Sequence, residues 1–509
     1  MTQPRRPEAT VRGSPVRRGH FCLKNYILLT AIAIGAWLVH GYHPMVEDAE
    51  IYVPAIKKIL DPTLYPSNAQ FFIGQTRLSL FPQLIALSVR LSHLPVEWVL
   101  FLGQFISILL LLWGCWRIGR RCFPEPGAAW CGVGLIAAML TLPVAGTALY
   151  LMDQYLTPRA LAAAAVVGGI ASMLEGKKRL AVAWVLFGLA MHPLMGVFAV
   201  GYLVLLACCE RMWPLGARVQ VAFLMLLLPP ASAAYREAVT TRSYLFLSQW
   251  EWYEWLGMVA PLGLLGWFMR TGRRHNLGTL ERMSHALLVY GAIFGIAGVL
   301  ITIPRSLIRL VEFQPMRSLH LLYLLLLVLG GGLLAQFVLK DRPWRWVLLF
   351  APLCAGMFFA QRQLFPASSH VEWPGGESRN DWVKGFDWIR QHTPASAYFA
   401  LNPEYMSLPG EDEHGFRAIA ERSRLADSGK DPGAVTIAPT IAGEWHEQVH
   451  ALDGWNNFQA GDFRRLNQRF GVDWVVLQQP GVPGMECPYR NAAVLVCRIA
   501  TVSLTPESK

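Results

Sequence analysis

The sequence predicts an α-helical, polytopic membrane protein with a small α/β domain at its C-terminal end. Two observations predict this architecture. Hydrophobic residues make up 54% of the 509 residues and charged residues only 16%, which is too apolar for a soluble globular chain of this length. Long apolar runs, each able to cross a hydrocarbon core about 30 Å thick, recur up to residue 361, and ordinary soluble patterning follows.

The apolar part, 25–361, is predicted to cross the membrane eleven times. The run 180–209 is too long for one span and contains Pro193, which lacks the amide hydrogen that a helix interior needs, so we divide it into two short helices. The predicted spans are 25–42, 96–116, 127–149, 160–175, 180–191, 194–209, 218–234, 251–269, 284–303, 319–339 and 344–361.

The distribution of positive charge predicts the orientation of these spans. Lys and Arg are retained on the cytoplasmic side of a membrane. If the basic tail 1–24 is cytoplasmic, the basic loops at 117–121, 177–179 and 270–282 fall on the same side, whereas 362–509 is outside and slightly acidic. The net charge of +11 is therefore a topology signal, and we expect no nucleic-acid partner.

The first outer loop is predicted to be long, from 43 to 95, and partly helical. Its segment "LSLFPQLIALSVRLSHL", 78–94, is apolar enough to be mistaken for a span. Counting it would place the arginine-rich loops outside, so we expect it to lie in the outer membrane interface. Its polar residues would then face the headgroups: Ser79, Gln83, Arg90 and His93.

Composition changes near residue 362, where a segment rich in Pro, Ser and Gly begins. We interpret 362–380 as a linker into an extracytoplasmic α/β domain, 381–509. Within this domain "GDFRRLNQRFGVDWVVLQQ" predicts a helix that ends at Gly471 and leads into a buried strand. Cys487 and Cys497 lie on the two arms of an apparent hairpin in an oxidising compartment, which makes them disulfide candidates.

The main chemical feature is the segment "HGYHPMVEDAEIYVPAIKKILDP", 40–62, which follows the first span and contains Glu47, Asp48 and Glu50. On a helix that starts near Pro44, Glu47 and Glu50 would share a face, and Asp48 would point about 100° away. These acids could simply stabilise the N-terminal end of a juxtamembrane helix. Alternatively, one carboxylate is a general base, and the others tune it or hold a divalent cation.

Positive side chains are predicted on the same side of the membrane. "TIPRSLIRLVEFQPMRSLH" places Arg305, Arg309 and Arg317 in one outer loop, where guanidinium groups would bind either a substrate phosphate or lipid headgroups. "MDQYLTPRA" adds Gln154 and Arg159. His192, at the tip of the broken helix pair, lines a cavity or caps a helix end. All six are substrate-binding candidates.

This combination of loop carboxylates after the first span, an interfacial helix, many spans and an outer α/β domain resembles the GT-C membrane glycosyltransferases. "DAEIYVPAIKKILDPTLYP" and "RLVEFQPMRSLHLLYLLL" are also similar to segments of uncharacterised bacterial membrane proteins grouped near that superfamily. The resemblance implies that Asp48 occupies the position of the base that deprotonates the acceptor, with Glu47 or Glu50 able to replace it.

The resemblance also implies the substrates and the location. The donor would be a sugar linked to a polyprenyl phosphate or diphosphate, and the acceptor would be a hydroxyl of a glycan, lipid or protein. Transfer would proceed with inversion at the outer face of a bacterial inner membrane, in contact with membrane lipid. The absence of an Asn-x-Ser/Thr sequon is consistent with a bacterial source.

Two other classes remain as alternatives. A noncatalytic subunit for assembly of envelope polysaccharide would have the same architecture. A transporter of lipids or small molecules would use polar residues near the middle of several spans, where this sequence has few ionisable groups. We find no Walker loop, dinucleotide-binding glycine pattern or zinc-site spacing, so a divalent cation at the carboxylates is the one cofactor that the pattern suggests.

Overall fold

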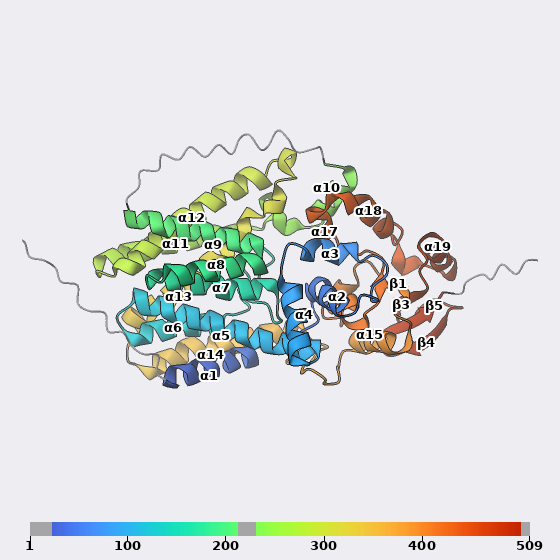
Figure 1. Ribbon diagram of the computed structural model, residues 1–509, viewed down its shortest axis with the longest axis horizontal. Helices are drawn as coiled ribbons and strands as arrows, with labels where there is room; N and C mark the ends of the chain where they lie inside the picture. The colour runs from blue at the N-terminus through green and yellow to red at the C-terminus, as the bar shows by residue number, and fades with distance from the viewer. Residues whose placement is uncertain (1–22, 212–230, 500–509) are drawn as a thin grey trace, which may run out of the picture.

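The structure is a computed structural model that describes residues 23–211 and 231–499. The molecule is elongated, with the long helices side by side at one end and the C-terminal region, 381–499, at the other (Figure 1). Helices of the first loop and α10 (Ala233–Thr240) lie between these two parts (Figure 1). The predicted tail 1–24 and the predicted span 218–234 lie almost wholly outside the described residues.

Five described helices are long and apolar enough to cross a membrane, which agrees with a helical membrane protein. They are α1 (Leu23–His40), α5 (Val96–Cys122), α12 (Gly278–Thr302), the continuous segment Val311–Leu339 that contains α13 (Leu319–Leu334), and α14 (Pro343–Leu364). The prediction of eleven such spans is therefore wrong for the described part of the chain.

The other apolar segments form helices that are shorter or less apolar. At 1.5 Å per residue, α6 (Pro126–Ala138), α7 (Pro158–Leu174) and α8 (Lys178–Met191) fall short of a hydrocarbon core of about 30 Å. The second half of the predicted span 127–149 is not helical, and Pro143 forms an isolated bridge with Tyr150. The longer α11 (Trp252–Arg274) has charged residues in both end turns.

The predicted break in the run 180–209 is confirmed. Helix α8 ends at Met191, and α9 (Pro193–Arg211) begins at Pro193, so His192 is the single residue between them. A proline fits the first turn of a helix because its missing N–H is not needed there.

The first loop contains three helices, α2 (Ala49–Leu60), α3 (Gln70–Thr76) and α4 (Phe81–Ser92). The apolar segment 78–94 forms α4, which at 12 residues is too short to span a membrane, as expected. Its predicted polar face is only partly correct. Arg90 is exposed, but Ser79 is buried, and its hydroxyl donates to the Met191 carbonyl at 2.5 Å.

The C-terminal region contains a mixed five-stranded sheet with helices packed on it. Its strands are β1 (Tyr398–Ala400), β2 (Ser423–Arg424), β3 (Trp474–Gln478), β4 (Glu486–Arg490) and β5 (Val494–Arg498), in the order β2-β1-β3-β5-β4. Strand β1 is parallel to β2 and β3, and β5 is antiparallel to β3 and β4. The helices are α15 (Asp381–His392), α16 (Phe416–Ala420), α17 (Pro432–Ile437), α18 (Ala442–His450) and α19 (Ala460–Phe470).

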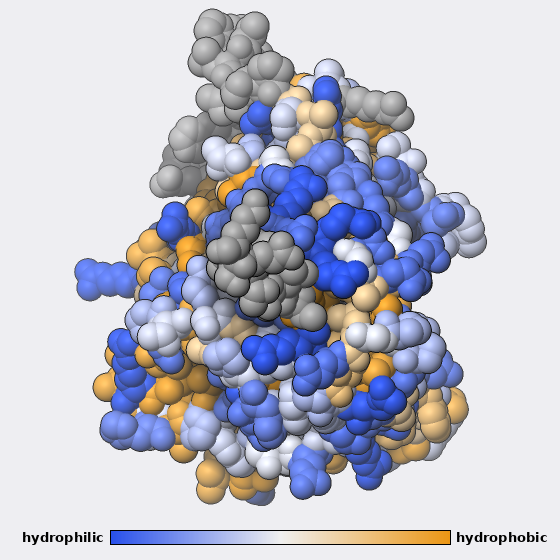
Figure 2. All heavy atoms as spheres, turned by 90° about the vertical axis from the view of Figure 1, so that its right-hand side faces the viewer, coloured by the Kyte–Doolittle hydropathy of each residue, from blue (hydrophilic) through white to orange (hydrophobic). Residues whose placement is uncertain are grey.

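Two local predictions in this region are confirmed. Helix α19 ends at Gly471, whose φ of +75° is the left-handed value that glycine adopts without steric cost. Cys487 on β4 and Cys497 on β5 form a disulfide. Viewed from this end, the surface is mainly hydrophilic, with hydrophobic residues mostly towards its edges (Figure 2).

Candidate functional site

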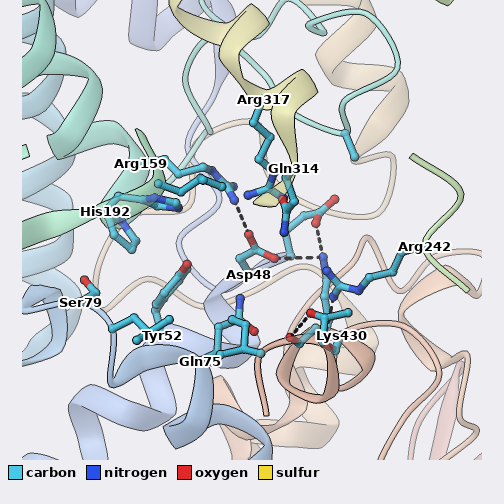
Figure 3. A pocket seen from close by; sticks show the side chains of 18 of the residues that line it. Asp48, Tyr52, Gln75, Ser79, Arg159, His192, Arg242, Gln314, Arg317 and Lys430 are labelled. Carbon is cyan, nitrogen blue, oxygen red and sulfur yellow. Dashed lines mark hydrogen bonds and ion pairs between the residues drawn. The ribbon is translucent and has the colours of Figure 1, made fainter. Parts of the chain in front are cut away.

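A pocket of about 670 Å³ lies where the first loop, the membrane helices and the C-terminal region meet (Figure 3). It is lined by residues near the start of α2, around the start of α7, at the α8–α9 break, and in the segments 241–244, 312–317 and 429–437. Its ionisable residues are Glu47, Asp48, Asp153, Arg159, His192, Arg242, Glu312, Arg317 and Lys430, together with Tyr52, Tyr150, Tyr155 and Tyr244.

Asp48 lies centrally in this pocket, with cationic side chains around it (Figure 3). Its Oδ2 accepts a hydrogen bond from Arg159 Nη1 at 2.7 Å, and its Oδ1 is 3.6 Å from Lys430 Nζ. Burial opposes ionisation, but Arg159 and Lys430 outweigh burial and hold the pKa of Asp48 well below its usual range. Asp48 is therefore an ionised carboxylate with low proton affinity.

The residue before Asp48 also faces the pocket. Glu47 forms an ion pair with Lys430, which overcomes the effect of burial and lowers the pKa of Glu47. Its backbone is left-handed, with φ of 56°, and α2 begins only at Ala49. The predicted helix from Pro44 is thus wrong, and Glu47 and Asp48, instead of Glu47 and Glu50, are the neighbours at the site.

Glu50 lies outside the pocket, fully buried against the C-terminal region. Its Oε1 accepts a hydrogen bond from Arg424 Nε at 2.9 Å, and its Oε2 accepts from the backbone N–H groups of Arg417 at 2.7 Å and Ala418 at 3.3 Å. With its oxygens occupied and no exposure, Glu50 joins the first loop to the C-terminal region. The structure therefore does not bring this predicted catalytic candidate to the pocket.

Arg159 and Gln154 both line the pocket, as expected from their position in one segment. Arg159 Nη2 lies 3.1 Å from Asp153 Oδ2, so Arg159 bridges Asp153 and Asp48. The Gln154 side chain donates to Gln361. Thr157 caps α7 through a hydrogen bond from the Ala160 N–H, which fixes the start of the helix that carries Arg159.

His192 combines both roles that the sequence left open. It lines the pocket, and its Nδ1 accepts a hydrogen bond from the Met195 N–H at 3.4 Å, at the start of α9. Because α8 ends and α9 begins next to His192, the break between the two helices brings this polar side chain to the pocket.

Two arginines present buried, unsatisfied donors at the pocket. In the described part of the chain, the Nε atoms of Arg317 and Arg242 are buried without a hydrogen-bond partner. The Arg317 guanidinium lies 5.9 Å from the Tyr244 ring centroid, and Arg242 Nη1 donates to the Tyr244 hydroxyl at 2.5 Å. Both residues line the pocket, so their guanidinium groups place positive charge beside Asp48.

Arg309, another arginine of the predicted phosphate-binding loop, is not part of this arrangement. Arg309 is absent from the pocket lining, and its guanidinium lies 5.0 Å from the ring centroid of Tyr235 on α10. The side chain of Arg305 lies outside the described part of the structure. Of the predicted loop arginines, Arg317 is the one described at the pocket.

Two pocket residues, Arg242 and Lys430, are not among those predicted from the sequence. Arg242 lies in a predicted outer loop, and that placement was the one available signal for it. Lys430 precedes α17 and comes from a part of the chain more than 380 residues away from Glu47, so no local pattern indicates it.

The two predicted carboxylates at the pocket already face protein cations. Glu47 pairs with Lys430, and Asp48 pairs with Arg159 and Lys430. This donor set does not favour the divalent cation that the sequence suggested here. No protein-family model and no curated protein matches this chain.

Proposed function

We propose that the protein is a membrane glycosyltransferase that moves a sugar from a polyprenyl-phosphate-type donor to an acceptor hydroxyl. One observation carries the proposal: the pocket lining combines the ionised Asp48 with the guanidinium groups of Arg242 and Arg317. A carboxylate suits the hydroxyl of an acceptor, and paired guanidinium groups suit a leaving phosphate.

The apolar part of the pocket lining supports a lipid-linked donor. Leu78, Val197 and Phe313 line the pocket and yet are 59%, 56% and 51% exposed. Apolar side chains that are exposed beside a cluster of charges are typical of a binding site for an amphipathic ligand. We propose that they contact the prenyl chain while Arg242 and Arg317 bind the phosphate.

In the proposed reaction the acceptor hydroxyl oxygen attacks the anomeric carbon, and its proton passes to an Asp48 carboxylate oxygen. The bond between the anomeric carbon and the phosphate oxygen breaks, and the phosphate leaves with the electron pair. A single displacement of this kind inverts the anomeric configuration. Because its ion pairs lower the proton affinity of Asp48, we assign the larger rate contribution to stabilisation of the departing phosphate by the arginines.

The orientation is part of the proposal. The pocket would face the outer side of a bacterial inner membrane, with the N-terminus in the cytoplasm and the C-terminal region outside. The basic loops at 117–121, 177–179 and 270–282 support this orientation, because cytoplasmic loops are enriched in Lys and Arg.

Binding of a polyprenyl phosphate to the purified, detergent-solubilised full-length protein tests the donor site, with the corresponding polyprenol as the ligand that lacks the phosphate. We expect Arg317→Gln and Arg242→Gln each to weaken phosphate binding about 10- to 100-fold, the equivalent of one charge-assisted hydrogen bond. Arg90→Gln is the matched control, because Arg90 is exposed on α4 and absent from the pocket lining.

Equal binding of polyprenol and polyprenyl phosphate would contradict the proposal, and so would unchanged affinity in both pocket variants. Specific phosphate binding without sugar transfer would instead favour the noncatalytic alternative.

A further inference from the structure

A second cluster of polar side chains lies outside the pocket, where α10 packs on α18. His446 and His450 are four residues apart on α18 and share a helix face. Glu237 on α10 faces both: its Oε1 is 2.7 Å from His450 Nε2, and its Oε2 is 3.2 Å from His446 Nε2. One ligand atom from each of the three residues lies within 4.8 Å of the others.

Apolar packing between α10 and α18 fixes the positions of the helices that carry these side chains. Tyr235, Ala238 and Val239 of α10 belong to one buried apolar cluster with Trp445 and Val449 of α18. Glu237, His446 and His450 lie on the same two helices as these apolar residues but on other faces. Burial of the apolar faces therefore fixes how the polar faces are placed relative to each other. Packing therefore sets the relative position of the two helices, and polar contacts orient the side chains on them.

A further carboxylate orients one of the histidines. Asp453 Oδ2 lies 2.7 Å from His450 Nδ1, on the opposite side of the ring from Glu237. In the metal-free protein both ring nitrogens donate, Nδ1–H to Asp453 and Nε2–H to Glu237. Loss of the Nε2 proton would leave its lone pair free for a metal while Nδ1–H stays bound to Asp453. Metal-binding histidines usually have such a partner on the other ring nitrogen.

We propose that Glu237, His446 and His450 bind a divalent transition metal of the zinc class, with water completing its coordination. Two nitrogens and one carboxylate oxygen are a common ligand set for Zn²⁺. Two metal–ligand bonds of about 2.0–2.1 Å at a tetrahedral angle would place the ligand atoms about 3.3 Å apart. The two histidine nitrogens lie 2.7 Å from Oε1 and 3.2 Å from Oε2 of Glu237, and one ligand atom from each residue lies within 4.8 Å of the others. Rotation of these side chains is needed to bring all three ligand atoms to this separation.

The i, i+4 spacing of the two histidines is visible in the sequence as "HEQVH", 446–450. The prediction that the sequence contains no zinc-site spacing did not take this segment into account. In the H-E-x-x-H pattern of zinc peptidases the glutamate is a general base. Here Glu447 Oε1 instead accepts hydrogen bonds from Arg469 at 2.6 and 3.1 Å. The proposal is therefore a binding site that joins α10 to the C-terminal region, and it goes beyond the proposed transferase function.

The test is titration of Zn²⁺ and Co²⁺ into the full-length protein, purified with a histidine-free affinity tag and stripped of metal, in the absence of lipid substrate. We expect one Zn²⁺ per chain, a higher melting temperature with the metal, and visible absorption of tetrahedral Co²⁺. Glu237→Gln and His450→Gln should abolish this binding. Asp453→Asn should weaken it about 10- to 100-fold, as is usual for a partner of a metal-binding histidine.

Glu447→Gln is the matched control, because it removes a carboxylate from the same helix without touching the three ligands, and it should bind Zn²⁺ like the wild type. The proposal is overturned if the wild type binds no more Zn²⁺ than a His446→Gln/His450→Gln double variant. It is also overturned if Glu447→Gln loses as much affinity as Glu237→Gln. Because the assay contains no lipid, these outcomes are independent of the proposed transferase activity.

Discussion

Replacing Glu50 with glutamine is expected to destabilise the fold by about 3–5 kcal/mol, the usual cost of breaking a buried ion pair. The wild-type Oε1 accepts from Arg424 Nε, and Oε2 accepts from the Arg417 and Ala418 backbone N–H groups. A glutamine has one oxygen for these two sides. The NH₂ group of the glutamine would face either the Arg424 N–H or the two backbone N–H groups, and a donor cannot bond to a donor. At least one buried donor therefore loses its acceptor, in addition to the loss of the negative charge.

Thermal or urea unfolding of the purified protein in detergent measures this effect. Glu97→Gln is the control, because Glu97 is 31% exposed and its oxygen is 4.0 Å from Lys57 Nζ, a geometry worth about 0–1 kcal/mol. The Glu50 variant should unfold much earlier than the control while its folded fraction keeps its affinity for polyprenyl phosphate. Equal unfolding of both variants, or lost affinity without lost stability, would refute the structural role of Glu50.

Three further predictions concern other parts of the chain. Cys497→Ser should cost about 2–3 kcal/mol in the unfolding free energy measured under oxidising conditions, because the disulfide closes a short loop of sequence separation 10. Burial alone would lower the pKa of His414, but Glu372, 3.2 Å away, outweighs burial and raises it. The stabilisation by this pair is then complete below about pH 6.5 and is lost as pH rises through the folded-state pKa, so melting temperatures should show a larger cost of His414→Gln at pH 5.5 than at pH 9. Reporter fusions after Lys178 should be active in the cytoplasm and fusions after Gly376 outside; the reverse pattern would contradict the proposed orientation.

The features that the sequence predicts well depend on local physical chemistry. A chain with this apolar content must bury its helices in lipid, a proline must interrupt a long apolar run, and Gly471 can end a helix in the left-handed conformation. The sequence assigns six candidates to the ends of apolar segments on one side of the membrane: Glu47, Asp48, Gln154, Arg159, His192 and Arg317. That common assignment is why the sequence could select six residues that the structure brings to one pocket.

The features that it predicts poorly depend on contacts between distant segments. Glu50 is buried by arginines more than 360 positions away, and the positive φ of Glu47 has no signature in a glutamate. The prediction of a regular helix from Pro44, with Glu47 and Glu50 on one face, therefore failed. Hydropathy also does not distinguish a membrane span from a shorter buried helix. For this reason the predicted span 127–149 is longer than the helix found there, α6, which ends at Ala138.

The most direct test of the account is the rate of sugar transfer from polyprenyl-phosphate-linked sugar by Asp48→Asn. The control is Asp61→Asn, an exposed position at the C-terminal end of the same helix. We expect Asp48→Asn to lose about two to four orders of magnitude in the rate of sugar transfer. It should still bind polyprenyl phosphate at least as tightly as the wild type, because removing the carboxylate leaves Arg159 and Lys430 with one fewer anionic partner. Full transfer activity in Asp48→Asn would contradict the account.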